Sequence, residues 1–408
     1  MTSTRTYEQI KKDVLQEITP SKKEYLLTKK IIDELLLELK RLFPEQKILL
    51  GGSTAKDTWL TKNHDIDFFI LFKQMPKDPL KKLETMGAKR VKGSRDYYQL
   101  SYKGFNIEMV PVIEVTKYTQ ANNVTDMSVL HVDHIKKYML PEQKKEVRLA
   151  KQFAKAQKVY GAESYINGFS GHVLELLIIE YKTFLGLLKA AANWPEQVIL
   201  DPKKHHKNPG MILNKEKTRS PLIIIDPVQP DRNAAAALSK KSFDMFCLAA
   251  KKFIQKPTIS VFRKKPLTIS RIKKLSGNKI IVELFALEEK RDTAGTKSLK
   301  AFEYICNHLD SFTITKKGFE YNHTRASALT YIIVKEKKLA SKYLHKGPPL
   351  NVTKAVAEFK KKHKKTFEQD KRICTELTRK HTTLHSQVNE LLTHKPVTTR
   401  TTKTKIIS

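Results

Sequence analysis

Apolar residues recur at helical spacing in several long segments of the chain. Between residues 21 and 43 they follow one another at intervals of three and four, and Ser21 with Glu24 has the sequence of a capping box directly after Pro20. Such a pattern predicts an amphipathic helix with one face in the core. The predicted helices span residues 7–18, 21–43, 80–86, 146–160, 172–192, 234–254 and 298–309.

Shorter apolar or alternating runs predict strands. Residues 65–72 form a nearly continuous apolar run after two aspartates, which is typical of a strand covered on both faces. Residues 97–102 and 105–112 are separated by Lys103-Gly104, which predicts a hairpin. Residues 122–134 form a polar connector. The other predicted strands span residues 222–225, 279–286, 312–321 and 326–335.

The order of these elements predicts a multidomain α+β protein. We expect a first domain over residues 1–140, a helical central domain over 141–256 and a small α/β body over 257–349. Residues 350–408 are rich in lysine and are predicted to form a basic helical tail, and from residue 395 onward we expect disorder.

Charge and cysteine content narrow the class of protein. The chain has 408 residues with 77 lysines and arginines against 42 acidic residues, a formal charge of +35. This excess predicts a polyanionic partner, most plausibly nucleic acid, although a genome-wide lysine bias is the alternative. Three isolated cysteines favour a reducing compartment and argue against a zinc site. With no apolar run of membrane length and a polar N-terminus, we expect a cytoplasmic protein that binds no membrane.

Candidate chemistry lies in the predicted strand at 65–72. Asp65 and Asp67 are two residues apart and therefore share one face of that strand. Paired carboxylates form a hard-oxygen site that suits Mg²⁺, and two such ions can activate a hydroxyl and stabilise a departing pyrophosphate. Glu108 in the hairpin completes a cluster of three carboxylates if the two strands are neighbours, and otherwise is an exposed edge residue. The alternatives without a function are that Asp65 and Asp67 lie at a solvated strand end and that Gly52-Ser53 forms an ordinary turn.

In combination, these residues resemble a known family. Gly52-Ser53 followed by Asp65-x-Asp67 looks like the signature of the DNA polymerase β-type nucleotidyltransferases, and residues 52–60 are similar to the archaeal, class I CCA-adding enzymes. Other segments that resemble this family, in the same order, are Val110-Pro111, 125–131, 146–151, 159–163, 168–171, 226–233 and 347–349.

The resemblance implies a template-independent enzyme that adds C, C and A to the tRNA 3′ end from CTP and ATP. It implies a polymerase β-like catalytic head, a nucleotide-binding central domain and a tRNA-binding body. Asp65, Asp67 and Glu108 would be the catalytic residues and would hold two Mg²⁺ ions, although the family usually has Glu, Asp and Asp there. The residues implied to contact the nucleotide are Gly52, Ser53, Lys56, Ser128, His131, Lys151, Tyr160 and Arg232.

Several alternatives stay open at this point. The alternatives within the enzymes are a related transferase that adds only A or only CC and a poly(A)-type RNA nucleotidyltransferase, and the motifs do not separate these activities. A basic RNA-binding protein on an inactive scaffold is the alternative outside the enzymes. The stripe of Arg148, Lys151, Lys155 and Lys158 is either a solvated helix face or, by the resemblance, part of the triphosphate site. The sequence leaves the oligomeric state undecided, with a homodimer as one option.

Overall fold

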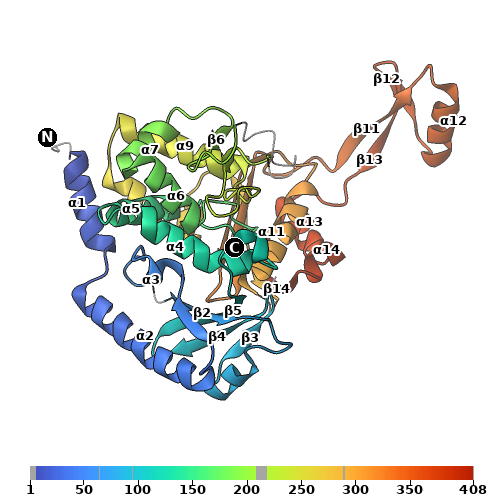
Figure 1. Cartoon of the computed structure of the whole chain (residues 1–408). Coiled ribbons are helices and arrows are strands. Elements are labelled where there is room, and N and C mark those ends of the chain that lie inside the picture. Colours follow the sequence, from blue (N-terminus) through green and yellow to red (C-terminus); the bar gives the residue numbers. More distant parts are fainter. Residues whose placement is uncertain (1–5, 64, 94, 208–217, 288–289, 408) are drawn as a thin grey trace. The chain divides into compact units, whose positions relative to one another are not determined.

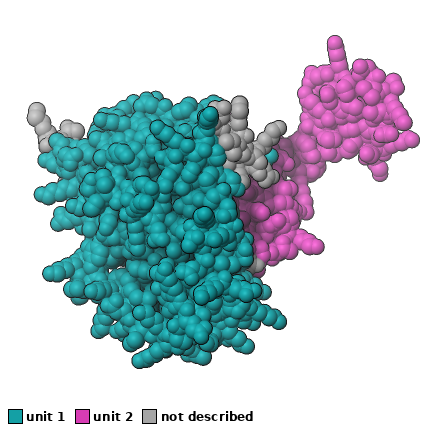
Figure 2. Space-filling view, in the orientation of Figure 1, with its two compact units in different colours: residues 1–265 teal, residues 266–408 magenta. Residues whose placement is uncertain are grey.

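The computed structural model describes residues 6–63, 65–93, 95–207, 218–287 and 290–407 (Figure 1). The chain divides into two compact units, Met1–Lys265 and Pro266–Ser408 (Figure 2). Each unit has its own sheet and its own hydrophobic core. In the described residues, no helix combines the length and the apolar character that a membrane crossing needs.

A five-stranded sheet forms the first part of unit 1, in the order β1-β2-β5-β4-β3. β2 and β5 are parallel neighbours, whereas the other pairs are antiparallel. The predicted strand at 65–72 and the predicted hairpin are confirmed. The strands are β1 (Lys47–Leu50), β2 (Asp65–Phe72), β3 (Lys89–Val91), β4 (Tyr97–Tyr102) and β5 (Phe105–Ile113).

Helix α2 (Lys22–Leu42) covers one face of this sheet (Figure 1). It begins with the predicted capping box, in which Ser21 Oγ accepts from the backbone N–H of Glu24 at 3.2 Å and the carboxylate of Glu24 accepts from Ser21 N–H at 2.8 Å. The buried side chains that join helix and sheet are Ile31, Leu35, Leu39, Ile66, Phe68, Ile70, Ile107 and Met109. These strand residues alternate with Asp65, Asp67 and Glu108, so the carboxylates lie on the opposite face.

Helix α4 (Ser128–Tyr138) packs on that opposite face through Val132, which contacts Phe69, Leu71 and Val112. The prediction of a polar connector over 122–134 was therefore wrong. Only Val132 and Ile135 of this helix are buried, so its apolar stripe is too short to stand out among polar residues.

The rest of unit 1 is mainly helical and surrounds an aromatic core. The ring of Phe153 lies 5.4 Å from that of Phe246 and 5.6 Å from that of Phe184. The helices are α1 (Tyr7–Ile18), α3 (Gly52–Ala55), α5 (Gln143–Ala156), α6 (Gly171–Tyr181), α7 (Phe184–Ala191) and α9 (Lys240–Gln255), with 3₁₀ turns at Lys81–Met86, Tyr118–Gln120, Val124–Met127 and Ile259–Phe262. Strands β6 (Val198–Leu200) and β7 (Leu222–Ile224) form a parallel pair.

Two predicted helices of this region were too long. The segment 172–192 is broken at Lys182, whose φ is +68°, and Thr183 then caps α7 by accepting from Gly186 N–H at 3.0 Å. The helix predicted to begin at residue 234 begins only at Lys240, after the cap Ser239.

Unit 2 has a four-stranded sheet in the order β14-β8-β10-β9 and a three-stranded sheet in the order β11-β13-β12. Helix α12 packs on the smaller sheet, where the ring of Phe359 stacks on His345 at 5.5 Å. The strands are β8 (Asn278–Ala286), β9 (Ile314–Asn322), β10 (Ser327–Val334), β11 (Lys342–Pro349), β12 (Phe367–Gln369), β13 (Arg372–Thr378) and β14 (Thr401–Ile407). The helices are α10 (Ile269–Lys273), α11 (Arg291–Asn307), α12 (Thr353–Lys362), α13 (Leu384–Leu391) and α14 (Lys395–Thr398).

The predicted helical tail contains three helices but also three strands, and the prediction of disorder from residue 395 onward was wrong. Residues 367–378 form two paired strands, and β14 pairs with β8 as an edge strand. The lysines at 403 and 405 are exposed on this edge, where charge blocks pairing with other chains. Edge protection and disorder both require polar residues, so composition did not separate them.

Candidate active site

The parallel pairing of β2 and β5 brings the three predicted carboxylates together. In this register Asp65 lies opposite Asn106 and Asp67 lies opposite Glu108. Burial, which is the largest cause, and the negative charges of Glu108 and Asp65 together raise the pKa of Asp67 to about 7, whereas Lys56 opposes the shift. Asp67 therefore lies close enough to both other carboxylates for their negative charges to raise its pKa.

Each of the two outer carboxylates accepts a hydrogen bond from a neutral amide. Asp65 Oδ1 accepts from Asn106 Nδ2 at 3.1 Å, and Glu108 Oε1 accepts from Gln99 Nε2 at 2.8 Å. An amide does not offset a negative charge, and three carboxylates at one edge of a sheet offer the oxygen ligands that Mg²⁺ prefers. The residues at this site thus fit divalent cations in both charge and ligand type.

The turn before α3 approaches Asp67 very closely. Gly52 has φ +58°, and a Cβ atom at this position would collide with the Asp67 carboxylate. Gly51 N–H donates to the backbone oxygen of Asp67 at 2.7 Å, and Thr54 Oγ1 donates to that of Asp65 at 3.1 Å. The predicted Gly52-Ser53 motif is therefore fixed beside the carboxylates, and only glycine fits at the first position.

A buried cluster joins the loop after α3 to helices α5 and α6. Lys56 Nζ lies 2.5 Å from Glu175 Oε2, and Lys151 Nζ lies 3.0 Å from Glu175 Oε1. Lys151 also donates to Thr58, at 2.8 Å to the hydroxyl and 3.2 Å to the backbone oxygen. Burial lowers the pKa of Lys151 to about 8. Burial alone would raise the pKa of Glu175, but the positive charges of Lys56 and Lys151 outweigh it and lower the pKa of Glu175 to about 2. The two predicted lysines thus share one counterion.

Sequence reasoning missed Glu175, because the segment 172–192 was interpreted as apolar core. A carboxylate that is 1% exposed in the middle of an apolar helix was the available signal, since a buried charge requires a partner. The solvated-face interpretation of the basic stripe is wrong for Lys151 and for Arg148. Arg148 is 3% exposed, and its guanidinium donates to the carboxylate of Asp57 at 2.6 Å and to Trp59 O at 2.9 Å.

A second polar network includes two other predicted residues. His131 Nε2 lies 2.8 Å from Asp226 Oδ2, and Arg232 Nη1 donates to the same oxygen at 2.6 Å. Asp226, which is fully buried, was not predicted as a site residue. Arg232 also lines a cavity of about 310 Å³ together with Ser170.

The remaining two residues predicted to contact the nucleotide, Ser128 and Tyr160, also lie in unit 1. Ser128 is the first residue of α4 and is partly exposed. Tyr160 pairs with Phe169 in an isolated bridge, and the ammonium of Lys155 lies 5.1 Å from its ring. Burial, Glu175, Glu163 and Asp65 raise the pKa of the Tyr160 phenol, which keeps it protonated.

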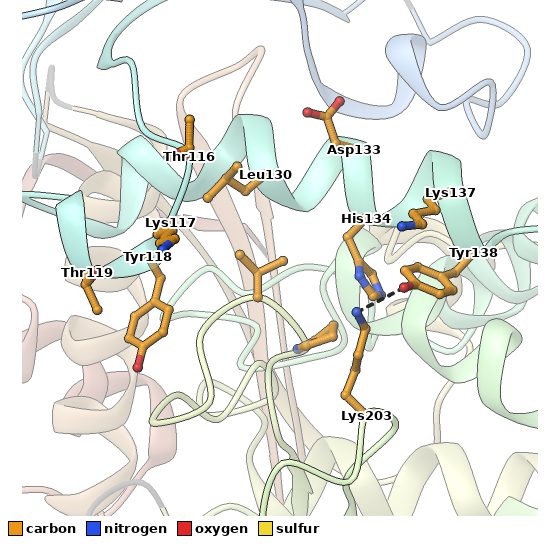
Figure 3. A pocket seen from close by; sticks show the side chains of 12 residues that line it. Thr116, Lys117, Tyr118, Thr119, Leu130, Asp133, His134, Lys137, Tyr138 and Lys203 are labelled. Atoms are coloured by element: carbon orange, nitrogen blue, oxygen red, sulfur yellow. Dashed lines mark hydrogen bonds between the residues drawn. The ribbon is translucent and has the colours of Figure 1, made fainter.

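A larger cavity of about 540 Å³ lies along α4 and does not include the carboxylates (Figure 3). Figure 3 shows Tyr118, Tyr138 and His134 around it, with Lys203 donating to the Tyr138 hydroxyl at 3.1 Å. The ammonium of Lys203 also lies 4.5 Å from the Tyr138 ring. Aromatic rings with adjacent cations are typical of surfaces that bind single-stranded nucleic acid.

Comparison with known proteins defines the class. Residues 32–159 match the family described as nucleotidyltransferase domain. A solved structure of the Cid1 poly(U) polymerase covers 64% of this chain and 100% of its own, with a TM-score of 0.52 and 17% identity. A cytoplasmic RNA terminal U-transferase gives a TM-score of 0.51 with the same coverage. The fold is that of the polymerase β-like nucleotidyltransferases, and the chain is an enzyme of this class, as predicted.

Sequence relatives define the family more narrowly. A CCA-adding enzyme of Nanoarchaeum equitans is 32% identical over 88% of this chain and 91% of the relative, and one of Methanothermobacter thermautotrophicus is 28% identical over 93% and 87%. Residues 145–263 match the second domain of tRNA nucleotidyltransferases, and residues 296–406 match the C-terminal domain of CCA-adding enzymes. The chain belongs to the CCA-adding enzyme family, which confirms the resemblance found in the sequence.

The first expected outcome concerns Gly52. Because a Cβ atom at this position collides with Asp67, we expect Gly52→Ala to displace that carboxylate and lower kcat/KM for nucleotidyl transfer by roughly 100-fold. The matched control is Gly104→Ala, which has a similar positive φ of +83° but open space around the added atom. Equal activity losses in the two variants would show that backbone strain, rather than the collision, is responsible.

The second expected outcome concerns Glu175, the counterion that Lys56 and Lys151 share. Removing the charge of Glu175 leaves two buried lysines without a counterion, so we expect Glu175→Gln to lower the free energy of unfolding by about 3–5 kcal/mol in urea titrations. Glu180→Gln, on the exposed face of the same helix, should change it by less than about 0.5 kcal/mol. A Glu175→Gln protein as stable as the Glu180→Gln protein would contradict the assigned role.

Proposed function

We propose that this enzyme adds C, C and A to the 3′ end of tRNA from CTP and ATP, without a nucleic-acid template and with release of pyrophosphate. The observation that carries the proposal is the register of β2 and β5, which places Asp65, Asp67 and Glu108 side by side next to the Gly52-Ser53 turn. Membership of the CCA-adding enzyme family and the formal charge of +35 support tRNA as the acceptor. In this proposal residues 1–140 carry the carboxylates, and 141–256 supply most of the nucleotide contacts.

The three carboxylates would hold two Mg²⁺ ions, because their repulsion has no cationic partner among the described residues and their oxygens suit this metal. When bound, such ions supply positive charge for the attacking 3′-hydroxyl and for the departing pyrophosphate. The chain's own contribution to catalysis is to position the reactants and to neutralise their charge. The turn at Gly52 and Ser53 lies beside the carboxylates, and in this proposal its backbone N–H groups receive phosphate oxygens.

Lys56 and Lys151 have different roles in this proposal. All three ammonium hydrogens of Lys151 have protein acceptors, at Thr58 and Glu175. Within the described parts of the chain, the ammonium of Lys56 has one acceptor, Glu175. We therefore assign direct triphosphate contact to Lys56, while Lys151 acts through its charge and holds Glu175 in place. One carboxylate offsets only one of two ammonium groups, so the cluster keeps a net positive charge for the anionic substrate.

The network around Asp226 is suited to hold the base and ribose. Asp226 fixes Arg232 by an ion pair at 2.6 Å, and the rigid guanidinium fork presents its other donors to the edge of a cytosine or adenine. His131, Ser128 and Tyr160 are assigned to the nucleotide by their match to the family's motifs. Their positions on α4 and next to α6 are consistent with this assignment.

Labelling of tRNA transcripts tests the function directly. With Mg²⁺ present, we expect CTP to be incorporated into transcripts that end before CCA or after the first C, and ATP into those that end after CC. Incorporation of only one nucleotide would favour an A-adding or CC-adding enzyme, and long runs of A would favour a poly(A)-type enzyme. No incorporation on any transcript, with tRNA binding intact, would indicate a non-catalytic RNA-binding protein.

The titration of Asp67 predicts a pH dependence. Its pKa is raised to about 7 in the metal-free protein, so the carboxyl is protonated below that pH and must lose its proton before a cation binds. We expect Mg²⁺ affinity to fall roughly tenfold from pH 8 to pH 6, with release of about one proton at pH 6. Calorimetry in two buffers of different ionisation enthalpy measures this proton. Proton release that persists in Asp67→Asn would contradict the assignment.

A further inference from the structure

A compact group of possible metal ligands does not include any of the three carboxylates. One ligand atom each from His131, His172 and Asp226 lies within 4.8 Å of the others. The three residues come from different elements of unit 1, since His131 is on α4, His172 is on α6 and Asp226 follows β7. We propose that His131, His172 and Asp226 bind a Zn²⁺ ion, a site that goes beyond the proposed function and does not depend on it.

His172 is the observation that points to a ligand. Both of its ring nitrogens are shielded from solvent, and neither has a hydrogen-bond partner among the residues that the structure describes. The ring lies 4.8 Å from that of His131, centroid to centroid, at 59°. A buried polar group without a partner costs free energy, so its presence calls for an explanation such as an ion. A metal ion would supply an acceptor for one nitrogen lone pair of His172.

The other two residues can accept an ion without losing their supports. The oxygens of Asp226 accept from Val228 N–H, Gln229 N–H and Arg232, at 3.0, 3.2 and 2.6 Å. The remaining carboxylate position faces His131 Nε2, at 2.8 to 3.0 Å. An ion in this position would replace one hydrogen bond, and Arg232 and the two N–H groups would orient the carboxylate, as outer hydrogen bonds do in zinc sites.

The ligand set favours zinc over magnesium. Two imidazoles and one carboxylate are a common zinc set, with a fourth position for water, whereas Mg²⁺ prefers oxygen ligands in octahedral geometry. The three isolated cysteines in the sequence argue against a zinc site with cysteine ligands. They do not bear on a site built from histidine and aspartate.

A zinc ion here would connect the base-binding network to the helices. It would join α4, α6 and the loop after β7, which carries Arg232. Coordination through Nε2 leaves Nδ1 of His131 available for a nucleotide. The ion would therefore act as a structural clip, and its loss should loosen this loop while the three carboxylates stay in place.

Zinc content of the untagged full-length protein tests the proposal. After treatment with chelator, the protein is equilibrated with Zn²⁺ in excess Mg²⁺, desalted and analysed by mass spectrometry of the metals. We expect one tightly held Zn²⁺ per chain and a rise in Tm on its addition. His172→Phe should weaken zinc binding by more than about 100-fold, since it removes a direct ligand. The matched control, His134→Phe on α4, and Asp67→Asn should keep the zinc.

Three results would overturn the proposal. The first is a wild-type protein that retains no zinc, and the second is a His172→Phe protein that retains as much zinc as the wild type. The third is a loss of zinc in Asp67→Asn alone, which would place the ion at the three carboxylates. If His172→Phe does not fold, His172→Gln and the visible spectrum of the Co²⁺-loaded wild-type protein decide. Tetrahedral bands that are lost in His172→Gln support the site, and the absence of such bands in the wild-type protein contradicts it.

Discussion

The parallel pairing of β2 with β5 is the constraint on which the site depends. It sets Asp67 opposite Glu108, with Asp65 two residues away, so three negative groups share one face of a sheet. They repel one another, and this repulsion adds to burial in raising the pKa of Asp67. The pairing persists because the other face of both strands is buried against α2. Burial of apolar side chains thus holds charges in an arrangement that only cations can relieve.

The positive side chains near the site are held by ion pairs, in contrast to the carboxylates, which repel one another. Two lysines from different parts of unit 1 meet at Glu175, and Arg148 binds the loop that carries one of them. These buried ion pairs fix the loop after α3 to α5 and α6. Sheet and helices are therefore connected by the same residues that would attract the triphosphate. Specific geometry, rather than net stability, is the main gain from such buried pairs.

Sequence patterns predicted the parts of this site that are local. Alternation in a strand placed Asp65 and Asp67 on one face, and the Gly52 turn was visible as a motif. That Glu108 lies next to Asp67 depends on which strands pair, which no local pattern determines. Glu175 was hidden in an apolar helix, because burial of a charge is explained only by partners distant in sequence. The edge strand β14 was missed for a related reason, since its exposed lysines resemble those of a disordered segment.

The central claim is that the carboxylates of β2 and β5 hold the catalytic cations jointly. A crystal structure with Mn²⁺ and a non-reactive CTP analogue, with anomalous diffraction to locate the metal, tests it most directly. The account predicts two Mn²⁺ ions ligated by Asp65, Asp67 and Glu108, with the triphosphate next to Gly52 and Lys56. Manganese bound without Glu108, or a nucleotide bound away from this edge of the sheet, would contradict it.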